Sequence, residues 1–205
     1  MERLVFFSDA VFAIAITLLV LEIKVPDRES IGSASALTHA LGALIPRFFA
    51  FFLSFLVVGF YWIQHHTMFR YIRRWDDRLI VINLLLLLCV AFLPFPVALL
   101  GSFRHYAPAM VFYAASLAAA GILQSVLWSY ATRHRRLVDP QLDTQVVRII
   151  HFRSLALPVV FAVSIPLSFV SPTLAPFSWI LIVPILRIIR RRLRKTAAAA
   201  RDVES

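Results

Sequence analysis

The sequence has few of the residues that build disulfides, metal centres and nucleotide-binding loops. Its 205 residues include one cysteine, Cys89, which cannot form a disulfide within the chain. No cysteine–histidine cluster has the spacing of a zinc site, and the five glycines form no phosphate-binding loop. We therefore expect no metal site, no cofactor and no nucleic-acid partner.

Apolar residues, by contrast, are abundant. They make up 60% of the chain, and its mean hydropathy is +0.82, whereas a soluble domain is about 45–50% apolar. A membrane-spanning helix needs roughly 20 mostly apolar residues. Six segments qualify, at about 4–23, 43–66, 79–100, 107–130, 149–170 and 173–193. The sequence thus predicts an all-α, polytopic membrane protein, with six transmembrane helices per subunit in a single domain over residues 1–205.

Arginine and lysine are concentrated on one side of the predicted spans. They cluster in the loop after the second span, in the loop after the fourth span and in the tail. The other side carries Lys24, Arg28, Arg47 and Arg104. The positive-inside rule then assigns both termini to the cytoplasm, which requires an even number of spans. We expect a multi-pass protein of the cell inner (plasma) membrane.

A basic cytoplasmic tail is expected after the sixth predicted span, over residues 194–205. The basic cluster that begins at the end of that span comprises Arg190, Arg191, Arg192, Arg194 and Lys195. Clusters of this kind bind anionic lipid headgroups, so membrane lipids are expected partners. The cluster is interpreted either as a positive-inside anchor or as a regulated lipid-binding site.

Prolines fall inside several of the predicted spans. A proline lacks the backbone N–H donor and bends a helix, and neighbouring helices can satisfy the carbonyl that loses its partner. The segment Pro94-Phe95-Pro96 is therefore predicted to bend the third span sharply. We interpret this feature as one that sets the shape of the bundle rather than its chemistry.

Polar side chains inside apolar spans are costly and usually face protein or water. They occur at the inner ends of the first three predicted spans, as Arg3, Ser8, Asp9, Trp62, His65, His66 and Asn83. Asp9 is expected to accept hydrogen bonds from histidine, serine or asparagine. The group is either a network that fixes the bundle or a proton-sensing or proton-relay site. A metal site is the least supported alternative, because two adjacent histidines project about 100° apart and no third ligand has suitable spacing.

The first predicted span also carries an aliphatic stripe. At about 100° per residue, Ile14, Leu18 and Leu21 fall on one narrow face, and Val11 and Phe7 extend it toward the cytoplasm. Ser8 and Asp9 project away from that face, so the polar pair can contact neighbouring helices while the stripe points elsewhere. From the pattern alone, the stripe could contact lipid, pack against a helix or line a pore.

The first span opens with Arg3-Leu4-Val5-Phe6-Phe7-Ser8-Asp9, which reads R-x-x-x-F-S-D. This pattern resembles the signature of the transmembrane protein 175 family, the endosomal and lysosomal potassium channels and their bacterial homologues. The segments Trp62-Ile63-Gln64-His65-His66 and Leu93-Pro94-Phe95, together with Asn83, extend the match. The resemblance therefore covers the first three spans, whereas the last three match in number and length alone.

The resemblance implies a homotetramer in which the first helix of each subunit lines the pore. It assigns the apolar constriction to Ile14, Leu18 and Leu21, and potassium preference to Thr17. It also implies a structural polar network, which comprises Arg3, Phe7, Ser8 and Asp9 with Trp62, His65 or His66, and Asn83. The family has no re-entrant selectivity filter, and no TVGYG-like loop occurs in this sequence.

These positions predict a potassium-selective or potassium-preferring cation leak channel. A tight ring of aliphatic side chains gates by dewetting, and potassium gives up its water more readily than sodium. The Thr17 hydroxyl either offers the ion a weak polar contact or bonds back to its own helix. Glu22 either forms an acidic ring at the outer mouth or is a solvated helix end.

Other functions are considered beside this one. The alternative is a proton channel or proton-coupled transporter that uses the buried aspartate and histidines. An enzyme is not expected, because Asp9 is the one carboxylate clearly inside a predicted span. A transporter would more often have paired broken helices, and the sequence has no such pair. A structural membrane scaffold also stays open.

Overall fold

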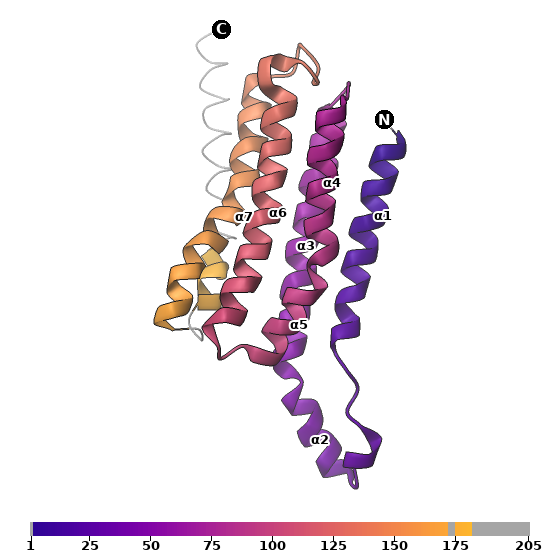
Figure 1. Cartoon of the computed structure of the whole chain (residues 1–205), viewed down its shortest axis with the longest axis vertical. Helices are drawn as coiled ribbons and strands as arrows, with labels where there is room; N and C mark the ends of the chain where they lie inside the picture. The colour runs from indigo at the N-terminus through magenta and orange to yellow at the C-terminus, as the bar shows by residue number, and fades with distance from the viewer. Residues whose placement is uncertain (1, 172–174, 182–205) are drawn as a thin grey trace, which may run out of the picture.

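The structure is a computed structural model, and it describes residues 2–171 and 175–181. Over this part of the chain the elements are helical, and the long helices run side by side as a bundle (Figure 1). The α-helices are α1 (Glu2–Leu18), α2 (Ala34–Ala43), α3 (Ile45–Tyr71), α4 (Asp77–Phe92), α5 (Pro94–Phe103), α6 (Ala107–Thr132) and α7 (Thr144–Val170). Short 3-10 helices are η1 (Leu19–Glu22), η2 (Arg28–Ser30), η3 (Arg133–Arg135) and η4 (Ala175–Leu181).

Five stretches of the described chain are long and apolar enough to cross a membrane. They are α1 with η1, α3, α4 with α5, α6 with η3, and α7. Of the sixth predicted span, the structure describes residues 175–181, which form η4. The rest of that span lies outside the described residues, as does the basic tail with Arg190, Arg191, Arg192, Arg194 and Lys195.

Helices α3 and α7 each extend about five residues beyond one end of the predicted span. Helix α3 continues to Tyr71, so that His65 and His66 lie well inside the helix rather than at its end. Helix α7 begins at Thr144 because Asp143 caps it, and the Asp143 carboxylate accepts a hydrogen bond of 2.7 Å from the backbone N–H of Gln145.

Helix α2 is an element that the sequence analysis does not predict. It begins where Ser33 supplies an N-cap, since its hydroxyl oxygen accepts a 3.2 Å hydrogen bond from the N–H of Ala36. No residue of α2 is buried, and the helix lies beyond one end of the long helices (Figure 1). It therefore forms from local capping rather than from packing.

The third predicted span is divided into two helices at Leu93, directly before Pro94. Pro94 has no N–H to donate to the preceding turn, so α4 ends at Phe92 and α5 begins at Pro94 itself. The rings of Phe92, Phe95 and Phe112 pack around the break, with centroids 5.5 to 6.1 Å apart. This aromatic cluster covers the junction of α4 and α5.

Helices α6 and α7 form the most closely packed pair in the bundle. Their approach depends on Gly121, because a Cβ atom there would lie 2.7 Å from Cδ of Pro158 on α7 and 2.8 Å from the hydroxyl of Tyr61 on α3. That hydroxyl donates a 2.8 Å hydrogen bond to the carbonyl of Leu117. Three helices thus meet at one small residue.

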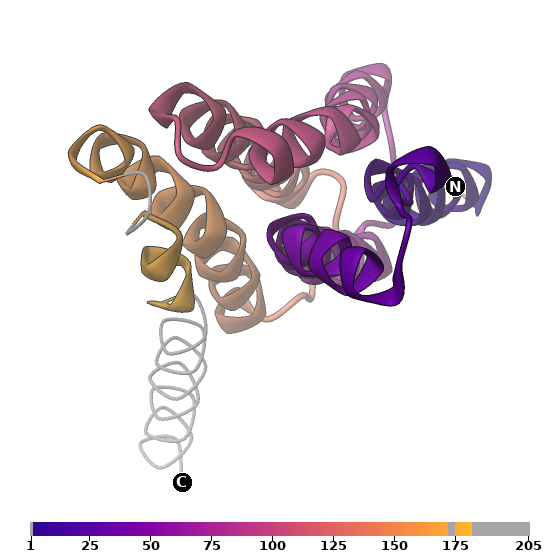
Figure 2. The same ribbon diagram turned by 90° about the horizontal axis from the view of Figure 1, so that it is seen from below.

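Helix α1 lies at the opposite side of the bundle from α7 (Figures 1 and 2). It packs against α3 and α4. The start of α1 lies at the same end of the bundle as two loops, which comprise residues 72–76 and 133–143 (Figure 1). Because both loops carry several arginines, we call this the arginine-rich end.

The two loops of the arginine-rich end are joined by backbone contacts. Ile72 and Val138 form an isolated antiparallel bridge. The N–H groups of Arg73 and Arg74 both donate to the carbonyl of Leu137, at 2.8 and 3.1 Å. These contacts hold the end of α3 beside the α6–α7 connection.

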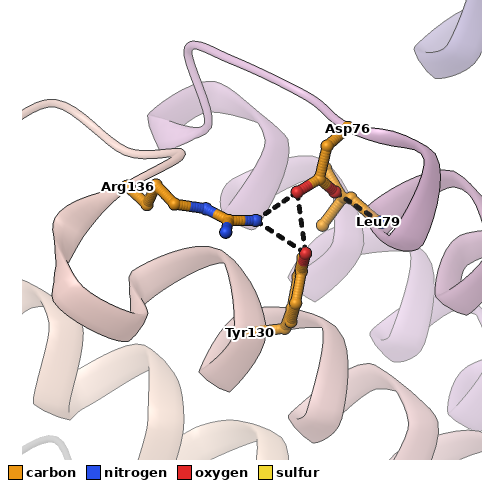
Figure 3. A network of polar contacts seen from close by, with 4 residues as sticks. All are labelled: Asp76, Leu79, Tyr130 and Arg136. Carbon is orange, nitrogen blue, oxygen red and sulfur yellow. Dashed lines mark hydrogen bonds and ion pairs between the residues drawn. The ribbon is translucent and has the colours of Figure 1, made fainter.

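A side-chain cluster fastens the start of α4 to the same place (Figure 3). The Asp76 carboxylate caps α4 by accepting from the N–H of Leu79 at 2.9 Å, and it also accepts from the Tyr130 hydroxyl at 2.7 Å. Arg136 forms an ion pair with Asp76 and donates to the Tyr130 oxygen at 2.7 Å. The pKa of Asp76 is lowered, mainly by the hydrogen bond from Tyr130. The Leu79 N–H and Arg136 lower it further, whereas burial acts in the opposite direction.

Candidate functional site

Helix α1 has two unlike faces. One face packs against the bundle and buries Ser8, Phe12 and Ala15, with Leu19 of η1 continuing it. The opposite face is exposed from the first turn to the last. The candidate site therefore has two parts, a polar attachment on the buried side and an apolar stripe on the exposed side.

The polar attachment joins three helices through fully buried side chains. The Asn83 amide on α4 donates to the Ser8 hydroxyl oxygen at 3.0 Å, and the Ser8 hydroxyl donates to the carbonyl of Leu4 at 2.8 Å. The Asn83 carbonyl oxygen lies 2.8 Å from Nε2 of His65 on α3. Because that oxygen can only accept, His65 must carry a proton on Nε2.

Aromatic rings enclose His65 in this network. The Phe69 ring stacks on the imidazole with centroids 4.4 Å apart, and the Phe12 ring of α1 lies 5.4 Å away on a tilted plane. Nδ1 of His65 is buried and has no hydrogen-bond partner among the described residues. The imidazole is thus held by one polar bond and by apolar packing, in a place that excludes water.

Asp9 has a different partner from the expected ones. Its carboxylate accepts a 2.9 Å hydrogen bond from the indole N–H of Trp62 on α3. In the described part of the chain it forms no hydrogen bond or ion pair with a serine, asparagine or histidine side chain. Asp9 follows Ser8 by about 100° around the helix, so it points at the outer edge of α3 rather than at its buried side. The structure therefore separates the predicted group into two contacts, one at Ser8 and one at Asp9.

Three residues of the predicted network lie outside both contacts. Arg3, Phe7 and His66 are exposed in the subunit. The His66 ring lies 5.8 Å from the Trp62 ring. Within residues 2–171 and 175–181, neither Arg3 nor His66 forms a side-chain hydrogen bond or an ion pair. In a single subunit these three side chains are thus accessible to solvent, lipid or another subunit.

The aliphatic stripe of α1 is on the outside of the subunit. Ile14 is 58% exposed, Leu18 is 40% exposed and Leu21 is 66% exposed. The Thr17 hydroxyl donates a 2.8 Å hydrogen bond to the carbonyl of Ile14, which is the back-bonded arrangement that the sequence left as an alternative. Thr17 itself lies on the exposed side of the helix. Glu22, at the end of η1, is half-buried.

The structure also contains buried amides that the sequence analysis missed. Gln124 on α6 is fully buried and donates a 2.9 Å hydrogen bond to the carbonyl of Tyr61. Gln64 is 3% exposed, and neither atom of its amide has a partner among the described residues. Burying a neutral amide in a span is costly, for the two glutamines as for Asn83. This cost is the signal that would have identified them.

Within the part of the chain that the structure describes, no three histidine, cysteine, aspartate or glutamate side chains are placed to hold a metal ion. What the arrangement offers is a rigid polar anchor on one side of α1. On the other side it offers an exposed apolar surface interrupted by a single hydroxyl.

Comparison with known proteins gives a consistent result. A family model described as "Endosomal/lysosomal potassium channel TMEM175" matches residues 3–94. A potassium channel of Streptomyces collinus is 40% identical over 174 residues, which cover 82% of this chain and 82% of that protein. The endosomal/lysosomal proton channel TMEM175 of Rattus norvegicus is 35% identical over 144 residues, which cover 66% of this chain and 29% of that protein.

A solved structure is similar over nearly the whole length. It is the crystal structure of a lysosomal potassium-selective channel TMEM175 homologue from Chamaesiphon minutus, with a TM-score of 0.79 and 34% sequence identity. The match covers 92% of this chain and 97% of that chain. The all-helical, multi-pass membrane fold is therefore shared between the two.

Proposed function

We propose that this chain, which belongs to the TMEM175 family, forms a potassium-selective or potassium-preferring cation leak channel of the cell inner membrane. In this proposal a homotetramer surrounds a pore, and α1 of each subunit lines it. Each subunit has six spans, with the sixth over about 173–193, and both termini lie in the cytoplasm. Potassium is the permeant ion, and no cofactor takes part.

The observation that carries the proposal is the exposure of the stripe on α1. The helix is fixed to its own subunit by polar contacts, yet its most continuous aliphatic face stays exposed on the outside of that subunit. The same side of the helix presents Ala10, Ala13 and Thr17. Small residues allow helices to approach closely in a membrane, so this face suits packing of several α1 helices around an axis better than contact with lipid alone.

The conduction mechanism follows from the side chains that would meet at that axis. Rings of Ile14, Leu18 and Leu21 offer an ion no oxygen ligand and exclude water when they are tight, so they gate by dewetting. An ion that crosses them gives up part of its water, and potassium does this at lower cost than sodium. The rings therefore favour potassium without a cage of carbonyl oxygens.

Flux through purified protein in liposomes tests the proposal. Replacement of Ile14 with serine makes the narrowest ring wettable, and potassium flux should rise severalfold. Leu88→Ser is the matched control, because Leu88 on α4 is 66% exposed and both residues lie about three turns from the arginine-rich end. An Ile14→Ser protein that is folded but conducts no more than wild type would contradict the assignment of the pore.

Thr17 and Glu22 are proposed to tune selectivity and conductance. With its hydrogen committed to the Ile14 carbonyl, the Thr17 hydroxyl presents only oxygen lone pairs to a passing cation. Thr17→Val should therefore reduce the ratio of potassium to sodium flux. An unchanged ratio of potassium to sodium flux in Thr17→Val would contradict the role of Thr17 in selectivity.

Glu22→Gln should reduce conductance at low ionic strength, where an acidic ring concentrates cations most. Unchanged conductance in Glu22→Gln would contradict the acidic ring.

Proton conduction is a second candidate. It is supported by the names of the mammalian relatives, which are proton channels, and by the buried His65, whose Nδ1 has no partner in the described chain. Reversal potentials under a pH gradient separate the candidates. If protons permeate, the reversal potential follows the pH gradient and His65→Gln suppresses that component while the potassium component persists.

A further inference from the structure

A pocket opens at the arginine-rich end, between the first turns of α1 and the end of α3. Its volume is about 780 Å³. Its floor is apolar, because Phe69 and Ile72 are both buried. Val5 and Phe6 of α1 form one wall, and the Phe6 ring is 71% exposed. The pocket thus has an apolar wall, an apolar floor and an open mouth.

The rim of this pocket is charged. Arg70 and Arg73 line it from the end of α3 and the residues just after it, and Glu2 lines it from the start of α1. All three are exposed. Over residues 2–171 and 175–181, the side chains of Arg70 and Arg73 form no hydrogen bond and no ion pair, with Glu2 or with any other residue. The first turn of α1 adds the positive end of a helix dipole.

The position of the pocket is at headgroup level. The membrane-spanning stretch of α3 ends at Tyr71, between the two arginines, and the adjoining loops are the arginine-rich ones. In the orientation that the positive-inside rule gives, this is the cytoplasmic face. A phosphate group at this depth meets two unpaired guanidinium groups, which bind phosphate oxygens bidentately.

We propose that this pocket binds an anionic phospholipid of the inner leaflet. The phosphate lies between Arg70 and Arg73, and the upper part of an acyl chain lies along Val5 and Phe6. Basic pockets between transmembrane helices at the cytoplasmic side are suited to acidic headgroups. The apolar wall continues into the bilayer alongside α1, which a lipid tail can follow and a soluble phosphate compound cannot use. This site is distinct from the stripe of α1, because Ile14, Leu18 and Leu21 do not line it.

The binding test uses the full chain, purified in neutral detergent and analysed by native mass spectrometry with added phosphatidylglycerol or phosphatidylcholine. Wild type should retain phosphatidylglycerol in preference to phosphatidylcholine. The double variant Arg70→Gln, Arg73→Gln should lose about 10- to 30-fold in affinity for phosphatidylglycerol. The matched control, Arg74→Gln with Arg78→Gln, removes the same charge from the same arginine-rich end but outside the pocket, and its affinity should stay within about twofold.

Glu2→Gln supplies a variant whose expected effect is a gain. Removing the opposing carboxylate from the rim should tighten phosphatidylglycerol binding severalfold, and this substitution at an exposed first-turn position leaves folding intact. An excess of soluble glycerol 3-phosphate should not displace the bound lipid, because it lacks the chain that contacts Phe6. These readouts are independent of ion conduction, so they stand whether or not the pore is as proposed.

Three outcomes would overturn the proposal. Equal losses in the two double variants would mean a general effect of surface charge. Displacement by glycerol 3-phosphate would mean a site for free phosphate compounds. A change in subunit stoichiometry in the Arg70→Gln, Arg73→Gln variant, with lipid retention unchanged, would mean that a neighbouring subunit occupies the pocket.

Discussion

Helices α1 and α6 are both long and apolar, and they are used in opposite ways. In the most apolar part of α6 and its extension, 56% of the residues are buried within the subunit, against 22% for α1 and its extension. Helix α6 presents small residues such as Ala114, Ala118 and Gly121 to its neighbours, which lets α3 and α7 approach. Helix α1 presents larger side chains, including Ile14 and Leu21, to the outside.

The difference shows that apolarity decides whether a helix enters the membrane but not what it contacts there. Between apolar helices in lipid, close packing and polar bonds provide the attachment rather than the hydrophobic effect. Helix α6 is held by packing along its length. Helix α1 packs through one face, with its polar bonds near its start, from Ser8 to Asn83 and from Trp62 to Asp9. Its outer face is left for another partner.

The largest expected effect concerns the packed side of this comparison. Gly121→Ala drives a methyl group into the Pro158 ring and the Tyr61 hydroxyl, and the ring cannot rotate away. It should lower the free energy of unfolding by about 2 kcal/mol, measured by thermal unfolding in detergent. Gly59→Ala in α3 is the control, because a Cβ there meets nothing within 4 Å, and it should be neutral or stabilising by up to about 1 kcal/mol. Equal stabilities of the two variants would contradict the three-helix contact.

The next effect concerns the polar attachment of α1. Asn83→Ala removes the side chain that links Ser8 to His65, and it leaves the buried Nε2–H of His65 without an acceptor. We expect a loss of about 1–2 kcal/mol in the free energy of unfolding, with a larger fraction of dissociated subunits on gel filtration. His66→Ala, which removes an adjacent exposed ring, should change stability by less than about 0.5 kcal/mol. If His66→Ala costs as much as Asn83→Ala, the attachment has been assigned to the wrong side chains.

The smallest effect concerns the cluster at Asp76, which fastens α4 to the α6–α7 connection. Asp76→Ala removes both the cap and the ion pair and should cost about 1 kcal/mol. Asp76→Asn keeps a capping oxygen and should cost about 0.5 kcal/mol, since the ion pair with Arg136 is solvent-exposed.

The lowered pKa of Asp76 gives this cluster a pH dependence. The charged carboxylate contributes its full stability above its unfolded-state value of about 3.9, and that contribution is lost as the pH falls through the lower folded-state pKa. The stability difference between wild type and Asp76→Asn should therefore be constant near neutral pH and shrink in acid. A difference that grows on acidification would reverse the assigned sign.

Much of the fold was predictable because it depends on composition and local stereochemistry. Runs of apolar residues located all five described spans, and the missing N–H of Pro94 located the break between α4 and α5. The division of α1 into a polar and an aliphatic face followed from residue spacing, which a helix converts directly into direction.

Other features depend on how neighbouring helices are rotated, which no single segment encodes. Trp62 was included in the polar group, but its role as the donor to Asp9 depends on the rotation of α3 against α1. Helix α2 buries no residue, so the spacing of its apolar residues does not predict a helix. The N-cap at Ser33 is the one local feature that predicts it. The amide of Gln64 lies inside the second predicted span, and the cost of burying an amide there is the signal that would have predicted it.

The most direct test of the central claim asks whether the exposed stripe of α1 faces a water-filled axis. Ile14→Cys, Leu21→Cys and the control Leu88→Cys are made in a Cys89→Ala background, which removes the only native thiol. A water-soluble methanethiosulfonate reagent is then applied during potassium flux from liposomes. Modification should reduce the flux through Leu21→Cys and Ile14→Cys, and it should leave the flux through Leu88→Cys unchanged. Flux that persists through both α1 variants, with their thiols reacting only with a lipid-soluble maleimide, would contradict the claim.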